Sequence, residues 1–319
     1  MNSFHFIARK VVVVGTGAVG ATFAYALAQE GTADEIALVD LNSELVKGQV
    51  LDLAHGLPFF PPVHIHAGDV SDYADAHVIV ITAGAKQRPG ESRLELLKRN
   101  AGLIEHITDD ITRQNSSAVI VVVSNPVDVL TYVAHKHSGL PHGRVIGSGT
   151  VLDSSRLRYL LSNHCGVDVH NVHAYILGEH GDSEFAVWSM TNLAGIPIED
   201  RCPACRKCGD WKVNRHAIEQ EVRNSAYHII DYKGATHFAV GLALVRIVGA
   251  VLRNEKSVLS VSTALNGEYG LSDVCLGVPC IVAQSGVEQI LEAKLTDTEK
   301  QALARSAKII RDAIESLEK

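Results

Sequence analysis

The sequence predicts an α/β protein with a doubly wound parallel sheet, followed by an α+β region. In the first half of the chain, short and nearly continuous apolar runs alternate with amphipathic segments. This alternation is typical of parallel strands that are buried on both faces and joined by helices. Directly after the first apolar run, residues 15–20 read GTGAVG, where a strand gives way to a helix. Glycines in that context indicate a Rossmann-type unit.

The individual elements follow from the same patterns. We expect strands at 11–14, 36–39, 78–82 and 119–123, with amphipathic helices at 19–30 and 43–55 between them. A last short apolar run lies at 144–147. We therefore end the first domain at Ser148, which gives a domain of residues 1–148 and a second domain of residues 149–319.

The second half is less regular. A helix is expected at 152–165, a long helical stretch at 224–252 with an interruption at 233–234, and a terminal amphipathic helix at 296–318. Residues 258–262 and 278–282 are expected to form antiparallel strands. Because no repeat or low-complexity linker separates the halves, we expect them to pack tightly.

Composition excludes several classes of protein. The chain has 319 residues, of which 46% are hydrophobic and 20% charged, an ordinary composition for a protein with a substantial core. A net charge of −7 argues against nucleic-acid binding, which needs clustered basic residues. No apolar run approaches the roughly 20 residues that span a bilayer, and the first residues lack a signal-peptide pattern. We expect a cytoplasmic protein with no nucleic-acid or membrane partner.

The glycine motif predicts a dinucleotide site. Gly15 permits a tight turn, Gly17 lets the backbone approach a pyrophosphate, and Gly20 lets helix and sheet pack closely. Asp40 ends the next strand, where its carboxylate can accept hydrogen bonds from ribose hydroxyls and would repel a 2′-phosphate, so NAD is favoured over NADP. The alternative is that the glycines serve only a tight turn.

Later strands of the sheet should meet the cofactor at their carboxyl ends. Small residues at Gly84 and Ala85 would leave room for it, and Asn125 could bind the nicotinamide ribose or a substrate oxygen. Alternatively, Asn125 and Pro126 only form the turn that ends a strand. The residues expected to contact the cofactor are Gly15, Gly17, Val19, Gly20, Asp40, Gly84, Ala85, Ser124, Asn125 and Ser148.

Three further segments carry candidate chemistry. Residues 174–183, AYILGEHGDS, place His180 in a short polar loop that we expect between an apolar run and a helix. Histidine titrates near neutral pH and can hand a proton to an oxygen. The polar loop 87–93 has the length of a lid that could deliver Arg93 to a carbonyl, although a surface loop looks similar.

Asp153 and Arg156 are three residues apart and therefore share a helix face. The arginine fork can hold a carboxylate through two hydrogen bonds, and the aspartate can hold an imidazole in one tautomer. A capping aspartate with a surface salt bridge is the alternative.

Together these stretches closely resemble the lactate/malate dehydrogenase family, and within it the bacterial L-lactate dehydrogenases, over nearly the whole chain. The most specific segments are GESRLELLKRN, SNPVDVLTY, RVIGSGTVLDSSRLR, NVHAYILGEHGDSE and KGAT. The resemblance implies an NADH-dependent, reversible reduction of pyruvate to L-lactate, a step of glycolysis and fermentation. In that reaction hydride is transferred to the carbonyl carbon.

The resemblance also implies a role for each site residue. His180 would be the proton donor and acceptor, and Asp153 its partner. Arg93 would polarise the carbonyl from the lid, and Arg156 would grip the substrate carboxylate. Asn125 and Thr236 would line the pocket.

Substrate choice is expected to depend on Gln87. In related malate dehydrogenases the matching position resembles an arginine that pairs with a second carboxylate. A neutral amide cannot compensate for desolvating that charge, so pyruvate is favoured over oxaloacetate. A malate or other 2-hydroxy acid dehydrogenase is the alternative enzyme. A dinucleotide-binding redox sensor is the alternative outside enzymes, but it predicts loss of His180 or Arg93, and both are present.

Two basic residues suggest regulation. Arg158 and His173 match positions that bind fructose 1,6-bisphosphate at a subunit interface in the allosteric members of the family. Cations brought together across an interface repel each other until a polyanion neutralises them, so binding would favour assembly. The resemblance implies a homotetramer. The alternative is a surface arginine and a histidine satisfied within a strand.

The segment 202–208, CPACRKC, departs from the family pattern. Cys202, Cys205 and Cys208, with His216 or an outside ligand, could hold zinc, but a second pair of ligands is missing. Reduced surface thiols are favoured over zinc, and a redox disulfide is the third alternative. Hydride chemistry needs no metal, so we assign none to catalysis.

Overall fold

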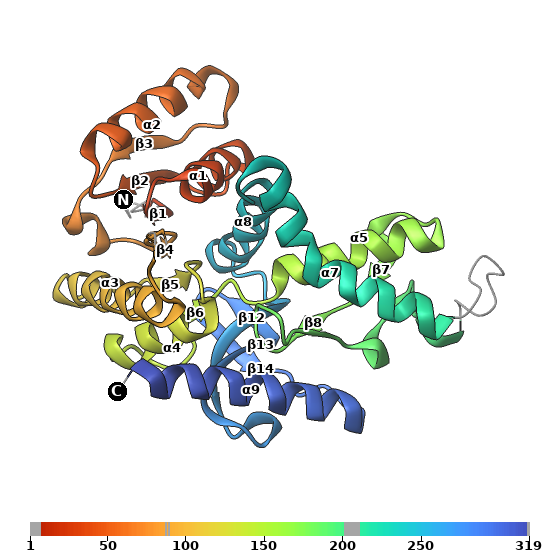
Figure 1. Ribbon diagram of the computed structural model, residues 1–319. Helices are drawn as coiled ribbons and strands as arrows, with labels where there is room; N and C mark the ends of the chain where they lie inside the picture. Colours follow the sequence, from red (N-terminus) through yellow and green to blue (C-terminus); the bar gives the residue numbers. More distant parts are fainter. Residues whose placement is uncertain (1–7, 87, 89, 201–210, 318–319) are drawn as a thin grey trace, which may run out of the picture.

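The computed structural model describes residues 8–86, 88, 90–200 and 211–317, and within them one nine-stranded sheet forms the centre of the molecule (Figure 1). The strand order is β14-β13-β12-β6-β5-β4-β1-β2-β3. Six strands pair in parallel: β1 (Lys10–Val14), β2 (Glu35–Val39), β3 (His64–Ala67), β4 (Val78–Ile81), β5 (Val119–Val122) and β6 (Val145–Gly147). The order runs outward in both directions from β1 and β4, so the sheet is doubly wound, as predicted.

Helices cover both faces of the parallel strands, which explains why every residue of β1, β4 and β5 is buried. On one face α3 (Arg93–Arg113) and α4 (Val127–Ser138) pack together and both contact α9 (Asp297–Leu317). Elsewhere α1 (Ala18–Glu30) lies beside α8 (Phe238–Leu252), and α2 (Ser43–His55) packs on β3 (Figure 1).

The sheet continues from the first half of the chain into the second. Ser262 of β12 (Ser257–Asn266) pairs with Gly147 of β6, and β13 (Ser272–Ala283) and β14 (Gly286–Ile290) extend the sheet in antiparallel fashion. This half also contains the helices α5 (Val151–Cys165) and α7 (Trp211–Lys233). One small sheet consists of β7 (Val172–His173), β10 (Asn192–Leu193) and β11 (Ile196–Pro197). A second small sheet consists of β8 (Ile176–Leu177) and β9 (Phe185–Ala186). Short 3-10 turns occur at Leu57–Phe59, Val70–Tyr73, Val169–Asn171, Trp188–Met190 and Glu268–Gly270.

The predicted fold class is confirmed, while three local predictions need correction. β3 was not expected, because only Ile65 of its four residues is buried and the apolar signal is therefore weak. α7 begins at Trp211 and not near 224, since few of its side chains are buried and no apolar stripe marks its first turns. The segment after His180 leads into strand β9 and not into a helix, because 185–186 pair with β8. Within the part of the chain that the structure describes, every helix is too short or too polar to cross a membrane.

Candidate active site

The glycine motif forms an open cradle between β1 and α1. Gly15 has a φ of +95°, and a Cβ there would lie 2.5 Å from the backbone nitrogen of Ala83. A Cβ on Gly20 would lie 1.9 Å from the carbonyl oxygen of Gly15, so helix and strand pack too closely for a larger residue. At Gly17, in contrast, a Cβ would meet nothing within 4 Å. Gly17 is also the N-cap of α1 and has no side chain to cap the first turn, so this space fits a bound pyrophosphate.

Asp40 lies beside this cradle at the carboxyl end of β2. Its Oδ2 accepts a hydrogen bond of 2.7 Å from the backbone N–H of Thr16, and its Oδ1 accepts one of 3.0 Å from the N–H of Asn42. These bonds hold the carboxylate against the glycine turn, where an adenosine ribose would lie. The residues present therefore fit a dinucleotide.

The next two strand ends meet at the same edge of the sheet. The N–H of Ala85 donates to Oδ1 of Asn100 (2.8 Å), and the amide nitrogen of Asn100 donates to the carbonyl oxygen of Asn125 (3.3 Å). The Ser124 hydroxyl donates to the carbonyl oxygen of Ala83, and the Asn125–Pro126 peptide bond is cis. Asn100, which sequence reasoning did not single out, thus ties the loops after β4 and β5 together.

The structure brings together two of the predicted catalytic residues, His180 and Asp153, and the predicted substrate-binding residue Arg156. Nδ1 of His180 lies 2.6 Å from Oδ2 of Asp153, and Nη1 of Arg156 lies 2.6 Å from Oδ1 of the same carboxylate. Asp153 and Arg156 are on α5, whereas His180 follows β8, whose end is held by backbone hydrogen bonds between Gly178 and Gly277. Since a carboxylate only accepts, Nδ1 carries a proton and Nε2 is the ring nitrogen left for a substrate.

The surroundings of His180 favour its charged form. Burial lowers the pKa of His180, but the charge of Asp153 and the hydrogen bond that His180 donates to it outweigh burial, and the pKa rises to about 9. Burial likewise opposes ionisation of Asp153, but His180 and Arg156 hold the pKa of that carboxyl below its usual value. The imidazole is therefore protonated at neutral pH, ready to act as an acid.

Two buried carboxyls that sequence reasoning missed support this pair. Asp128 on α4 accepts the backbone N–H of His180 (2.7 Å) and the hydroxyl of Ser262 (2.6 Å), and burial raises the pKa of Asp128 to about 6. A carboxylate oxygen of Glu184, a carboxylate oxygen of Asp153 and a ring nitrogen of His180 all lie within 4.8 Å of one another. Burial, followed by the charge of Asp153, raises the pKa of Glu184 well above its usual value. The only sequence signal for Glu184 is an acidic residue directly before an apolar run.

Three further predicted residues, Arg93, Arg156 and Thr236, line cavities of the structure. Arg93, at the start of α3, lines a cavity of about 820 Å³ together with Glu179 and Glu184 from the His180 segment. Arg156 and Thr236 line a second cavity of about 430 Å³. Arg93 and Arg156 therefore line separate cavities, and Arg156 is linked to His180 through the carboxylate of Asp153.

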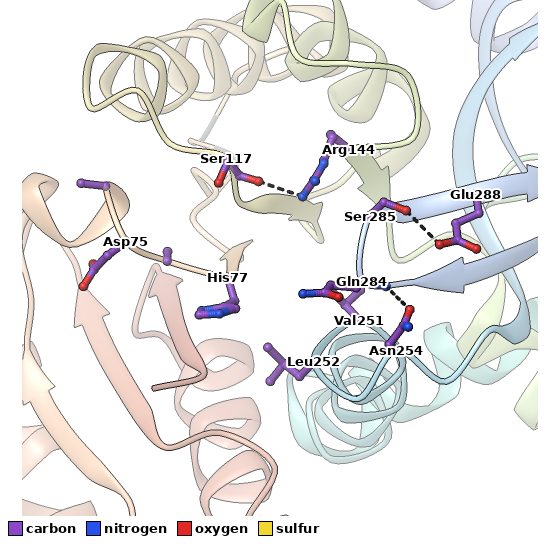
Figure 2. Close-up of a pocket in the computed structure, with 12 residues that line it drawn as sticks. Asp75, His77, Ser117, Arg144, Val251, Leu252, Asn254, Gln284, Ser285 and Glu288 are labelled. Atoms are coloured by element: carbon purple, nitrogen blue, oxygen red, sulfur yellow. Dashed lines mark hydrogen bonds between the residues drawn. The ribbon is translucent and has the colours of Figure 1, made fainter. Parts of the chain in front are cut away.

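Another cavity, of about 470 Å³, lies at the opposite edge of the sheet (Figure 2). It is lined by His77, Ser117 and Arg144, which precede β4, β5 and β6. These positions are at the amino ends of the strands, away from the glycine cradle. None of the candidate site residues predicted from the sequence and described by the structure lines this cavity.

The two candidate regulatory residues lie together. Arg158 and His173 line a cavity of about 310 Å³, and Arg246 of α8 adds a third basic side chain that sequence reasoning did not find. Nε of Arg158 donates to the carbonyl oxygen of Val172 (2.8 Å), which holds its side chain beside β7.

Four of the predicted positions lie outside the described residues. They are Gln87, on which substrate choice was based, and the candidate zinc ligands Cys202, Cys205 and Cys208. Val19 and Ser148 are described: Val19 is in the first turn of α1, and the N–H of Ser148 donates to the carbonyl oxygen of Val122 (2.8 Å).

A glycine cradle at the switch point of a doubly wound sheet, with a buried Asp–His pair nearby, defines a dinucleotide-dependent oxidoreductase. Comparison with known proteins makes this specific. Residues 9–147 match the NAD binding domain of the lactate/malate dehydrogenase family, and residues 150–319 match its alpha/beta C-terminal domain. The chain belongs to the lactate/malate dehydrogenase family, whose members are NAD-dependent oxidoreductases.

Individual relatives cover almost the full chain. An L-lactate dehydrogenase of Treponema denticola is 60% identical over 96% of this chain and 97% of its own length. One from Acetivibrio thermocellus is 50% identical over 98% of both chains. Among solved structures, a lactate dehydrogenase from a deep-sea metagenome library superposes with a TM-score of 0.95 at 45% identity, covering 98% of this chain and 100% of its own. The ligands-bound form of the minor L-lactate dehydrogenase of Enterococcus mundtii superposes with a TM-score of 0.94 at 41% identity, covering 98% of this chain and 99% of its own.

Proposed function

We propose that this protein is an L-lactate dehydrogenase that reversibly reduces pyruvate to L-lactate with NADH. The observation that carries the proposal is the 2.6 Å contact between His180 and Asp153, which keeps an acid of pKa about 9 next to Asp128, at the start of the helix that follows β5. The names of relatives that are 50–60% identical over nearly the full chain support the same activity. We also propose that the chain divides into domains 1–148 and 149–319.

In this proposal each side chain has a distinct task. When bound, NADH supplies the hydride. His180 gives the proton on Nε2 to the ketone oxygen, and Asp153 holds the other ring nitrogen and stabilises the positive charge that precedes the transfer. Arg156 grips the substrate carboxylate, for which its fork geometry is suited. Arg93, at the N-terminus of α3, polarises the ketone and stabilises the developing negative charge on its oxygen.

The proposed pocket has two further parts. Asn125 and Thr236 line it, and the residues of the glycine cradle, Asp40 and the strand ends hold the cofactor. Charge on the bound carboxylate is balanced by Arg156, while burial raises the pKa of the neighbouring Glu184 well above its usual value.

The test of the proposed substrate uses Gln87. NADH oxidation is measured with pyruvate and with oxaloacetate in the wild type, in Gln87→Arg and in the uncharged control Gln87→Met. We expect the wild type to prefer pyruvate. We expect Gln87→Arg to raise the oxaloacetate-to-pyruvate ratio of kcat/KM by about a hundredfold or more, because pairing a buried charge is worth roughly 2–5 kcal/mol. A wild type that prefers oxaloacetate would establish the malate alternative, and absence of turnover with any 2-oxo acid would favour a redox sensor.

We further propose that fructose 1,6-bisphosphate activates a homotetramer through Arg158 and His173. Support comes from the cavity that these residues share with Arg246, where three basic side chains could receive two phosphate groups. The pyruvate saturation curve is measured with and without the sugar bisphosphate, in the wild type and in Arg158→Gln, with the oligomeric state followed by sedimentation. We expect the activator to shift the wild-type curve only; a curve that does not move in the wild type contradicts the proposal.

A further inference from the structure

A histidine-rich cluster lies on the edge strand β3, apart from the proposed active site. His64 and His66 occupy alternate positions of β3, so their side chains share one face of the sheet. Their rings are stacked with centroids 4.8 Å apart. Glu35 of β2 is the direct register partner of His64. Ligand atoms from these three residues all lie within 4.8 Å of one another.

The hydrogen bonds of His66 are those of a metal ligand. Its Nδ1 lies 3.1 Å from the carbonyl oxygen of Ala67, and because a carbonyl only accepts, Nδ1 carries the proton. Nε2 then points at Oε1 of Glu35, 3.0 Å away. A carboxylate and an imidazole lone pair do not approach so closely unless a proton or a cation lies between them. Histidines that bind metals typically donate their other N–H to a carbonyl or carboxylate in this way.

The charges around the cluster favour a divalent cation. Nζ of Lys10 lies 2.7 Å from Asp72, 2.8 Å from Asp75 and 3.3 Å from Glu35. Three carboxylates therefore surround one ammonium, which leaves two negative charges uncompensated when the histidines are neutral. Oδ1 of Asp72 also lies 3.9 Å from Nε2 of His66. One divalent ion at the histidines would bring this group close to neutrality.

We propose that Glu35, His64 and His66 form a binding site for a divalent transition metal ion of the zinc type. Two imidazoles and one carboxylate are ligands that zinc prefers over magnesium or calcium, with water completing the coordination. In a tetrahedral site with bonds of about 2.0–2.1 Å, ligand atoms are roughly 3.4 Å apart, so the distances between ligand atoms in the cluster need to shorten by at most about 1.4 Å. The exposed side chain of His64 is free to make that movement.

The site would hold β3 to β2 and not take part in hydride transfer. Lys10, Glu35 and His64 are the first residues of β1, β2 and β3, whereas the glycine cradle lies at the carboxyl ends of these strands. Because β3 is an edge strand with one paired neighbour, a metal that joins it to β2 should protect it from local opening.

The test measures Zn²⁺ binding by competition with a chromophoric chelator. The full-length protein carries Ser at positions 202, 205 and 208 (Cys202→Ser, Cys205→Ser, Cys208→Ser), so that this cysteine cluster cannot supply the signal; the thiols of Cys165, Cys275 and Cys280 remain but are buried. We expect one ion per chain. We also expect at least a tenfold loss of affinity in His64→Asn and in His66→Asn, since losing even an indirect partner of a metal ligand costs about 10–100-fold. His170→Asn is the matched control, because His170 pairs with a single carboxylate, Asp168, at 2.7 Å on the surface.

A structural readout accompanies the binding measurement. Zn²⁺ should raise the thermal midpoint of the triple-serine protein and slow amide exchange in β3, while neither change occurs in His66→Asn. Far-UV circular dichroism and NADH binding establish that each variant is folded. Absence of Zn²⁺ binding at micromolar concentrations would overturn the proposal. So would binding that is equally strong in His64→Asn, His66→Asn and His170→Asn.

Discussion

Replacing Asp153 with Asn tests whether the charge of this carboxylate raises the pKa of His180, as the proposed mechanism requires. The pKa of His180 is about 9 in the folded protein against an ordinary value of 6.5, a difference of about 3 kcal/mol in favour of the charged ring. Burial acts in the opposite direction, so the carboxyl groups around His180, of which Asp153 contributes most, together supply more than this net amount. Without that charge, burial should leave the pKa of His180 at or below 6.5.

The assay is the pH dependence of kcat/KM for pyruvate at saturating NADH. In the wild type, activity should be constant near neutrality and fall as pH rises through about 9, because His180 loses the proton that it donates. In Asp153→Asn the fall should move down by at least about 2.5 pH units, so that at pH 7.5 only about one molecule in ten or fewer is protonated. Asp168→Asn, which removes the carboxylate from an exposed Asp–His pair, should leave the profile unchanged. A pH midpoint that stays near 9 in Asp153→Asn would refute the reasoning.

Three further predictions follow from the same geometry. His180→Ala should nearly abolish turnover while NADH binding, followed by fluorescence, survives; loss of both would mean that the histidine is structural. Gly17→Ala should keep the wild-type thermal midpoint, since the added Cβ meets no protein atom, but should weaken NADH binding about tenfold, or roughly 1.4 kcal/mol. Asp128 is buried with its pKa raised to about 6, so its stabilising contribution is present at low pH and lost as pH rises through 6. The stability of Asp128→Asn relative to the wild type in urea should therefore increase by about 3 kcal/mol between pH 4 and pH 7, and a constant difference would contradict this.

Much of the fold was predictable because its signals are local. Each of the strands β1, β2, β4 and β5 contains an apolar run of four residues, long enough to be recognised without knowing its neighbours. The predicted bounds of α2 agree with the structure, where Asn42 caps the first turn and a glycine follows the last. β3 escaped prediction since an edge strand buries little surface and carries little apolar pattern.

The candidate site likewise has one part that could be predicted from the sequence and one part that could not. Gly15, Gly17 and Gly20 are close in sequence, and their spacing alone predicted the cradle that the backbone forms. The roles of Asp128 and Glu184 could not be predicted, because a carboxyl acquires a shifted pKa only when distant segments bury it. Asp128 is 52 residues from His180 and 134 residues from Ser262, and only the folded chain joins the three.

The sequence by itself determined the parallel sheet and the dinucleotide motif, both of which depend on neighbours within a few positions. The tertiary structure decided that the sheet runs on from β6 into β12, that α5 and the segment after β8 meet at Asp153 and His180, and that a histidine pair faces Glu35 on an edge strand. Charge interactions fall off with distance and grow with burial, so the protonation of His180 is a property of the packed molecule and not of its sequence motif.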